Sequence, residues 1–371
     1  MSGIYFHIPF CRSRCIYCDF FSSTSLKEKE LYVDVMCKEL MDRKGYLPGQ
    51  SIQTIYFGGG TPSQLSAQNF EKIFQTIDTC YPEISENKKN LEITLEANPD
   101  DLSSEYLNLI KHLPFNRISL GIQSFNDKEL RFLRRRHDSE SAIRAIKQLQ
   151  ENGFSNISID LIYGLPGQTL EIWEDNLAKA LMLDIQHISA YHLIYEENTP
   201  LFQLLKQGLV EPVQEELSVQ LFELLIQKLN EAGFEHYEIA NFSKQGYRSK
   251  HNSSYWDGTH YLGIGASAHS YNGFSRQWNK KTEGPNYREV TKEILTSQMA
   301  YNDFIITRLR RVEGIELPEL AMLFGEKMKG YCLEQAQKYI KDCLLEIKTN
   351  RLKLTKKGLF VSDGIMSALM I

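Results

Sequence analysis

The sequence lacks any apolar run of the ~18 residues that a membrane-spanning helix needs. It also lacks a strong charge of one sign, because 42 Lys and Arg stand against 47 Asp and Glu, so no global field attracts nucleic acid. No long apolar segment precedes a cleavage signal, and we expect no secretory leader and a cytoplasmic location. With 371 residues, of which 42% are hydrophobic and 24% charged, the chain has the composition of a globular protein with a large core and room for a second domain.

The first two hundred residues alternate β-type runs with amphipathic helical patterns. Strands are predicted at Ile4–His7, Thr54–Phe57, Leu91–Leu95, Arg117–Leu120, Ile157–Leu161 and Ile188–Leu193. Helices are predicted between them, at Lys27–Asp42, Ala67–Thr79, Ser103–His112, Ser139–Asn152 and Leu170–Leu183. This alternation predicts an α/β fold with a parallel sheet and right-handed crossovers. Eight repeats would close a barrel, so six predict a partial (β/α)6 barrel.

The pattern changes after Thr199-Pro200, which divides the chain into predicted domains 1–205 and 206–371. The second domain is predicted as α+β. It begins with a helix over Val213–Ala232 and ends with helices at Tyr301–Arg308, Leu317–Phe324 and Leu333–Cys343. Residues 345–361 are predicted to form a β-wing, which completes a winged-helix-like module. The basic residues of this module are few, and small winged modules also serve as docking or cover domains. We therefore predict no nucleic-acid binding.

The seven cysteines separate into two groups. Four are scattered and are predicted to be buried free thiols: Cys37, Cys80, Cys332 and Cys343. The other three are Cys11, Cys15 and Cys18, with C-x3-C-x2-C spacing directly after the first predicted strand. Three thiolates on a tight loop can each bind one iron of a [4Fe-4S] cluster and leave the fourth iron open.

Other interpretations of the three cysteines remain open on spacing alone. Structural zinc needs four ligands, and His7 could complete a Cys3His set. Three unpaired thiols in a loop are the remaining alternative. The motifs further along the chain favour the iron–sulfur cluster.

Further motifs follow the next predicted strands in order. They are Gly58-Gly59-Gly60-Thr61-Pro62, Leu95-Glu96-Ala97-Asn98-Pro99, Gly121-Ile122-Gln123-Ser124-Phe125-Asn126 and 160–169, DLIYGLPGQT. Together with the cysteine motif and its aromatic Tyr17, this series resembles the radical S-adenosylmethionine (SAM) superfamily. Within it, the chain is similar to the branch that contains oxygen-independent coproporphyrinogen III oxidase and the HemW heme chaperones. The resemblance covers nearly the whole chain.

The resemblance implies a set of SAM-binding residues beside the cluster ligands Cys11, Cys15 and Cys18. They are Tyr5, Tyr17, Gly59, Gly60, Thr61, Glu96, Gln123, Arg135 and Asp160. Glu96 and Asp160 could accept hydrogen bonds from ribose hydroxyls, and Gln123 and Arg135 can donate. Taken singly, the Gly run would be a strand-to-helix turn and the Arg134–Arg136 run a charged helix face.

Two departures argue against the oxidase. The oxidase motif carries a fourth cysteine where this chain has Phe20, and only ten residues precede Cys11, whereas the oxidase has a long N-terminal extension. Instead, His251-Asn252-Ser253-Ser254-Tyr255-Trp256 matches the H-N-x-x-Y-W pattern of the HemW group. His251 is a candidate axial ligand of heme iron, with local packing of the histidine as the alternative. His236, His260 and His269 compete for that role.

The resemblance therefore implies a heme chaperone that binds heme and transfers it to an acceptor apo-hemoprotein. Its cofactors would be a [4Fe-4S] cluster, SAM and heme. The alternative is an enzyme, an oxygen-independent coproporphyrinogen III oxidase. A flavodoxin or ferredoxin as electron donor, a homodimer, and membrane contact only through the acceptor are further expectations of the resemblance.

The run Gly263-Ile264-Gly265-Ala266-Ser267-Ala268 imitates a dinucleotide-binding fingerprint. Because a polar, turn-rich stretch follows it, no βαβ unit fits there. We predict a tight turn near the cofactor mouth instead.

Overall fold

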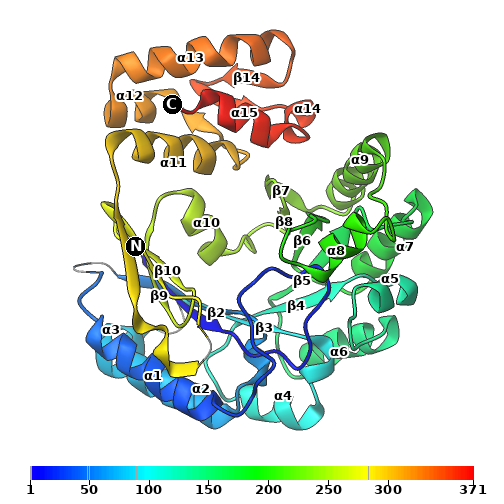
Figure 1. Cartoon of the computed structure of the whole chain (residues 1–371), viewed down its shortest axis with the longest axis vertical. Coiled ribbons are helices and arrows are strands. Elements are labelled where there is room, and N and C mark those ends of the chain that lie inside the picture. Colours follow the sequence, from blue (N-terminus) through cyan, green and yellow to red (C-terminus); the bar gives the residue numbers. More distant parts are fainter. Residues whose placement is uncertain (1, 48, 50, 88–89, 283) are drawn as a thin grey trace.

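The structure is a computed structural model that describes all residues except 1, 48, 50, 88–89 and 283. Its main feature is a twelve-stranded sheet with the order β12-β11-β10-β9-β1-β2-β3-β4-β5-β6-β8-β7 (Figure 1). The strands are β1 Ser2–Ile8, β2 Ile52–Gly59, β3 Glu92–Ala97, β4 Arg117–Gln123, β5 Ile157–Tyr163, β6 His187–His192, β7 Glu235–Glu238, β8 Asn241–Ser243, β9 His260–Ile264, β10 His269–Tyr271, β11 Ser275–Asn279 and β12 Val290–Ile294.

Seven neighbouring strands, from β9 through β1 to β6, run parallel, and the outer pairs are antiparallel. The sheet ends at β12 on one side and β7 on the other, so it is the predicted partial barrel. All six predicted parallel strands are confirmed. The strands beyond residue 205 extend the same sheet at both edges, and the division at that residue stays a prediction.

Helices connect and cover the strands. They are α1 Lys29–Asp42, α2 Ala67–Cys80, α3 Pro82–Asn87, α4 Ser104–Ile110, α5 Asp127–Phe132, α6 Ser139–Glu151, α7 Leu170–Leu181, α8 Pro200–Lys206, α9 Glu215–Glu231, α10 Lys250–Trp256, α11 Ser297–Leu309, α12 Leu317–Phe324, α13 Glu326–Lys341, α14 Lys356–Leu359 and α15 Ser362–Leu369. The short 3-10 helices within the described residues are η1 Pro62–Gln64, η3 Pro99–Asp101 and η4 Gly284–Arg288. Among the described helices, none is both long and apolar enough to cross a bilayer.

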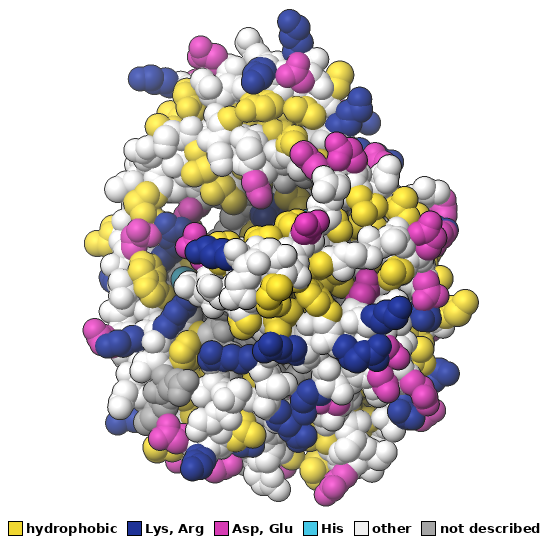
Figure 2. Space-filling view, turned by 45° about the vertical axis from the view of Figure 1, so that its right-hand side comes forward, with side chains coloured by type: hydrophobic (Ala, Val, Ile, Leu, Met, Phe, Trp, Pro, Cys, Tyr) yellow, Lys and Arg dark blue, Asp and Glu magenta, His cyan; other side chains and the backbone are white. Residues whose placement is uncertain are grey.

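The C-terminal helices form a layer of their own with a second hydrophobic core (Figure 1). Beside them lies a three-stranded sheet of β13 Ile315–Glu316, β15 Arg351–Leu354 and β14 Leu345–Lys348. Figure 2 shows that the face of the molecule is hollowed between this layer and the barrel.

One part of the predicted wing is wrong. Residues 345–354 form the expected hairpin, but residues 356–359 and 362–369 are helical, as α14 and α15. Thr355 caps α14, since its Oγ1 accepts a hydrogen bond of 3.1 Å from the Gly358 amide. In α15, Ile365, Met366 and Leu369 are buried at helical spacing against the second core, which favours a helix over a strand.

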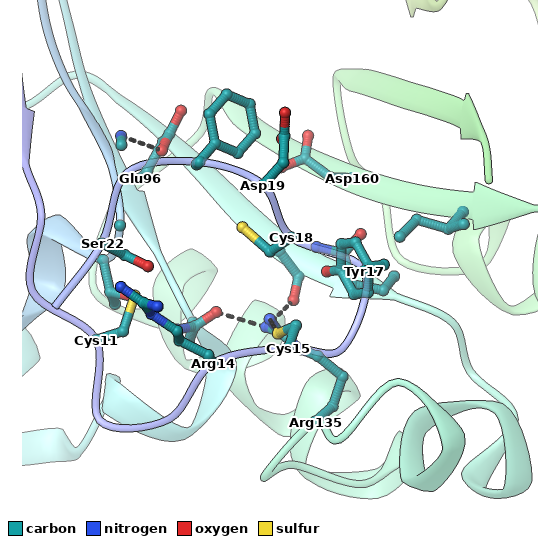
Figure 3. A pocket seen from close by; sticks show the side chains of 18 of the residues that line it. Cys11, Arg14, Cys15, Tyr17, Cys18, Asp19, Ser22, Glu96, Arg135 and Asp160 are labelled. Atoms are coloured by element: carbon teal, nitrogen blue, oxygen red, sulfur yellow. Dashed lines mark hydrogen bonds between the residues drawn. The ribbon is translucent and has the colours of Figure 1, made fainter. Parts of the chain in front are cut away.

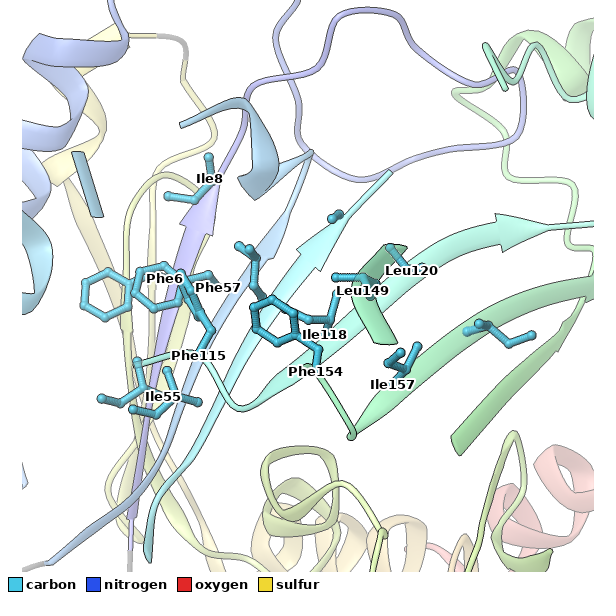
Figure 4. Packing of buried hydrophobic residues seen from close by; sticks show 14 of the residues in the cluster. Phe6, Ile8, Ile55, Phe57, Phe115, Ile118, Leu120, Leu149, Phe154 and Ile157 are labelled. Carbon is cyan, nitrogen blue, oxygen red and sulfur yellow. The ribbon is translucent and has the colours of Figure 1, made fainter. Parts of the chain in front are cut away.

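The two faces of the barrel sheet have different chemistry. On the outer face, apolar side chains of β1 to β5 pack under the helices, with Phe6 stacked on Phe57 at 4.8 Å between ring centroids (Figure 4). Alternate residues such as Tyr56, Glu96 and Asp160 face the barrel interior, because successive strand side chains point to opposite faces. The barrel interior is thus polar, and its open end can receive a polar ligand.

Candidate cofactor site

A cavity of about 410 Å³ lies where the carboxyl ends of the parallel strands meet the cysteine loop. This edge is where open α/β sheets place their ligand sites. The cavity brings together every predicted site residue except two: Cys11, Cys15, Tyr17, Cys18, Gly59, Gly60, Thr61, Glu96, Gln123, Arg135 and Asp160. Tyr5 and His251 lie elsewhere. The prediction that these residues share one site in space is therefore met for most of them, while their contacts with SAM stay predictions.

The cysteine loop closes on itself beyond β1. Backbone bonds from Cys11 N to Ser23 O, at 2.9 Å, and from Ser23 N to Pro9 O, at 2.6 Å, join its two ends. Figure 3 shows the three cysteine side chains directed into the space that the loop encloses. All three thiols are free and partly exposed. Within the described residues, no three His, Cys, Asp or Glu side chains are arranged to hold a single metal ion.

The surroundings of the thiols fit an iron–sulfur cluster. Burial raises the pKa of the Cys11 thiol and raises that of Cys18 to about 11, so cluster binding would release protons. Thr61 Oγ1 lies 3.3 Å from Cys11 Sγ, and Arg135 Nη1 donates to Cys15 Sγ at 3.3 Å. These contacts place a hydroxyl beside the Cys11 sulfur and a cation beside the Cys15 sulfur. His7, the fourth ligand that zinc would need, lines a neighbouring groove instead.

The glycines of the second motif are required by close packing. Gly59 has a φ of +111°, and a Cβ there would lie 2.6 Å from the His7 ring. A Cβ on Gly60 would lie 2.7 Å from the Pro9 carbonyl carbon. Gly60 N also donates to Ile8 O at 2.8 Å, and Gly59 N to a Glu96 carboxylate oxygen at 3.2 Å. The motif thus binds the β2 turn to the base of the cysteine loop.

Arg135 is turned into the cavity by the end of α5. The preceding Arg134 adopts a left-handed conformation with φ of +58°, which does not continue the helix. The three arginines at 134–136 therefore do not form one charged helix face. Arg135 Nη2 donates to Asn98 Oδ1 at 2.5 Å and to Gly121 O at 2.6 Å. Its Nε is buried without a hydrogen-bond partner, which leaves one donor for a ligand.

Two half-buried carboxyls, those of Glu96 and Asp160, complete the polar end of the cavity. Burial raises the pKa of Glu96 to about 7, although Tyr56 OH donates to its Oε1 at 2.7 Å. Burial also raises the pKa of Asp160 to about 6. As pH rises through neutrality, the Glu96 and Asp160 carboxyl groups lose their protons. The resulting carboxylates accept hydrogen bonds from hydroxyl groups such as those of a ribose.

Sequence reasoning missed several cavity residues. Asn98 joins two predicted residues, because its Nδ2 donates to Thr61 Oγ1 at 3.2 Å while its Oδ1 accepts from Arg135. The sequence could have pointed to Asn98, because this residue lies in the third motif, Leu95-Glu96-Ala97-Asn98-Pro99. Ser119 and Tyr191 also line the cavity. Alternation along β4 with Gly121 could have identified Ser119, whereas Tyr191 lies on β6 and its place depends on the register of that strand with β5.

Tyr5 and His251 lie behind or beside the cavity. Tyr5 OH lies 3.2 Å from His7 Nδ1, and both residues line the neighbouring groove. His251 is 1% exposed, and both ring nitrogens are engaged: Nδ1 with Thr54 Oγ1 at 2.7 Å and Nε2 with Tyr255 OH at 2.9 Å. Its role as a heme ligand stays a prediction, and in this conformation the ring makes the local contacts of the alternative interpretation.

The first two residues of the predicted turn at 263–268 are the end of strand β9, and the turn itself begins at Gly265. Gly265 has a φ of +103° and Ser267 one of +64°, and the chain continues into strand β10. No helix follows the glycines among the described elements up to β12 other than the short η4, so the dinucleotide interpretation is rejected as predicted.

Comparison with known proteins agrees with this architecture. The model of the radical SAM superfamily matches residues 5–180, and that of the HemN C-terminal domain matches residues 295–361. The HemW heme chaperone of Lactococcus lactis is 33% identical over 380 residues, covering 100% of this chain and 97% of that protein. That of Bacillus subtilis is 32% identical over 384 residues, with 100% and 99% covered. The chain belongs to the HemW family of radical SAM proteins.

A solved structure supports the fold. Coproporphyrinogen III oxidase (HemN) from Escherichia coli, a radical SAM enzyme, superposes with a TM-score of 0.81 and covers 100% of this chain and 90% of its own. At 21% sequence identity, that likeness concerns the fold alone.

The radical SAM match supports a [4Fe-4S] cluster and SAM as cofactors, and the residues of the cavity fit both. When bound, such a cluster supplies an electron for reductive cleavage of the sulfonium. Cys11, Cys15 and Cys18 would hold it. Arg135 would donate from its free Nε, and Glu96 and Asp160 would accept from hydroxyls.

Proposed function

We propose that this protein binds heme and transfers it to an acceptor apo-hemoprotein. The observation that carries the proposal is similarity along the whole of this chain to proteins named as HemW heme chaperones, two of which are covered to 97% and 99% of their length. The cluster and SAM would occupy the cavity at the carboxyl ends of the strands, with heme bound outside it.

Phe20 supports the chaperone over the oxidase. It stands where the oxidase motif has a fourth cysteine, and it is 67% exposed at the rim of the cavity. An exposed phenyl ring at this position cannot supply a thiol, but it offers an apolar surface to a flat ligand. We therefore favour a carrier of a finished macrocycle over an enzyme that decarboxylates one.

The remaining expectations are part of the proposal. We place the protein in the cytoplasm, with a flavodoxin or ferredoxin as electron donor and a membrane in contact only through the acceptor. A homodimer is the proposed assembly.

The test measures heme transfer after anaerobic reconstitution with iron and sulfide. The heme-loaded protein is mixed with increasing concentrations of a b-type apo-cytochrome, and with apomyoglobin as a passive scavenger. A chaperone hands heme over in a complex, so the transfer rate to the cytochrome rises with acceptor concentration and exceeds the rate to apomyoglobin. Equal, concentration-independent rates would mean that heme simply dissociates, and would overturn the proposal.

A second assay on the same sample separates the chaperone from the oxidase. Coproporphyrinogen III, SAM and a reductant are incubated with the reconstituted protein without air. We expect no protoporphyrinogen. Its formation at a catalytic rate would favour the oxidase.

A further inference from the structure

A second depression, here called the aromatic groove, lies beside the cofactor cavity. Its volume is about 360 Å³, within the range of small-molecule sites. Its lining residues are Tyr5, His7, Asp19, Phe20, Phe21, Tyr255, Tyr261, Ser267, His269 and Lys281. Phe20 and Asp19 line the cofactor cavity as well, so the cysteine loop separates the two spaces.

The lining of the groove suits a flat, apolar ring with acidic groups. Aromatic side chains supply its walls, and rings of this kind pack against planar ligands. Lys281 is exposed at the groove and has no ion-pair partner among the described residues. Its ammonium group can pair with a carboxylate. The ligand class that combines a planar ring, carboxylates and a metal centre is a metalloporphyrin.

His269 is the groove residue that can bind a metal. Two histidines line the groove, and His7 uses both nitrogens, with Nδ1 near Tyr5 OH and Nε2 at 2.9 Å from Phe21 O. The ring of His269 is exposed and stacks on Trp278 at 5.8 Å, and neither of its nitrogens has a hydrogen-bond partner in the described part of the chain.

The H-N-x-x-Y-W segment reaches the groove through its tyrosine. Tyr255 lines the groove, and His251 lies behind it, with Nε2 at 2.9 Å from the Tyr255 hydroxyl. Two backbone amides at the start of α10, those of Lys250 and His251, donate to the Glu92 carboxylate at 2.9 Å each. His251 is thus a positioning residue for the groove wall.

We propose that heme binds in the aromatic groove, with His269 as an axial ligand of the iron and Lys281 paired with a propionate. This assignment rests on the proposed function and names the heme-binding site of the proposed chaperone. It differs from the sequence-based expectation, which gave the ligand role to His251.

The test titrates hemin into the full-length protein, reconstituted without air, and follows the Soret band and the EPR spectrum. His269→Ala is expected to lose the histidine-ligated spectrum and to weaken hemin binding by ~10-fold or more. Added imidazole should restore the spectrum, because it can enter the space left by the side chain. His251→Ala is the comparison variant. It should keep the iron–histidine signal even where hemin affinity falls, because His251 positions Tyr255 and does not bind the iron. His112→Ala, an exposed histidine outside the groove, is the control.

A second ligand isolates the propionate contact. Lys281→Ala should weaken binding of hemin by ~3-fold to 10-fold but leave binding of hemin dimethyl ester unchanged. Equal losses for both ligands would overturn the role of Lys281.

The outcomes separate the two proposals. If wild type binds hemin and His269→Ala keeps both spectrum and affinity, the assignment of His269 is overturned while the chaperone proposal stands. If wild type binds no hemin at all, the chaperone proposal fails and the assignment fails with it.

Discussion

The guanidinium of Arg135 donates a hydrogen bond of 3.3 Å to Cys15 Sγ and so connects the end of α5 to the cysteine loop. The two residues are 120 positions apart in the chain. Through the same guanidinium, Asn98 and the Gly121 carbonyl become neighbours of the proposed cluster. Arg135 is therefore where the predicted SAM-binding residues and the predicted cluster ligands meet.

Replacement of Arg135 tests this connection. Arg135→Ala is expected to weaken SAM binding by ~10-fold to 100-fold, since charged hydrogen bonds in a buried site contribute ~1.5–3 kcal/mol. Arg135→Lys should recover little, because an ammonium lacks the planar fork that reaches three partners. The measurement is anaerobic calorimetry with SAM. Arg134→Ala, the exposed neighbour, is the control, and wild-type affinity in Arg135→Ala would contradict the prediction.

The cysteine ligands are tested by iron content. Cys11→Ala, Cys15→Ala and Cys18→Ala should each lower the iron bound per chain after reconstitution by ~10-fold or more, because a cluster with two thiolates is labile. Cys80→Ser removes a cysteine from α2 and should retain the full iron content. Equal iron in the Cys80 and Cys18 variants would show that the cluster is bound elsewhere.

Packing at the second motif predicts a loss of stability. In Gly60→Ala, the new methyl group would approach the backbone of Pro9 to 2.7 Å, and the loop must shift. Such overpacking costs ~1–3 kcal/mol of unfolding free energy. Gly45→Ala is the matched control, because nothing lies within 4 Å of its Cβ position. Urea unfolding of both variants measures the difference, and identical midpoints would contradict the packing argument.

Burial of His251 makes stability depend on pH. Burial lowers its pKa to about 3 from an ordinary value of about 6.5, so the unfolded chain binds a proton that the folded chain does not. The stabilising contribution is complete above pH 6.5 and is lost as pH falls toward 3. By pH 5 the loss is about 2 kcal/mol.

The check compares wild type with His251→Gln in urea at pH 7.5 and pH 5. Wild type should lose about 2 kcal/mol more between the two conditions, because glutamine does not titrate. Other buried histidines titrate in both proteins and cancel from the comparison. Parallel pH profiles would mean that His251 is accessible to protons in the native state.

Local sequence signals were sufficient for the barrel strands and for the grouping of most candidate site residues in one cavity. The strands are short β-type runs with turn motifs at their carboxyl ends, and parallel strands bring those ends to one edge. The three cysteines lie within eight residues, so their grouping needed no tertiary information. Helix α14 was mistaken for part of a wing because a four-residue helix has too few residues for a periodic signal.

By itself, the sequence determined the α/β alternation, the cysteine loop and the residues at the strand ends, since spacing along the chain encodes all of these. Only the tertiary structure decided that β9 pairs with β1 and that His251 is enclosed while His269 is exposed. The pairing of Ser2 with His260 spans most of the chain, and no local period records such a contact. Whether a histidine is accessible to a ligand depends on what packs over it, and that is fixed when distant segments come together.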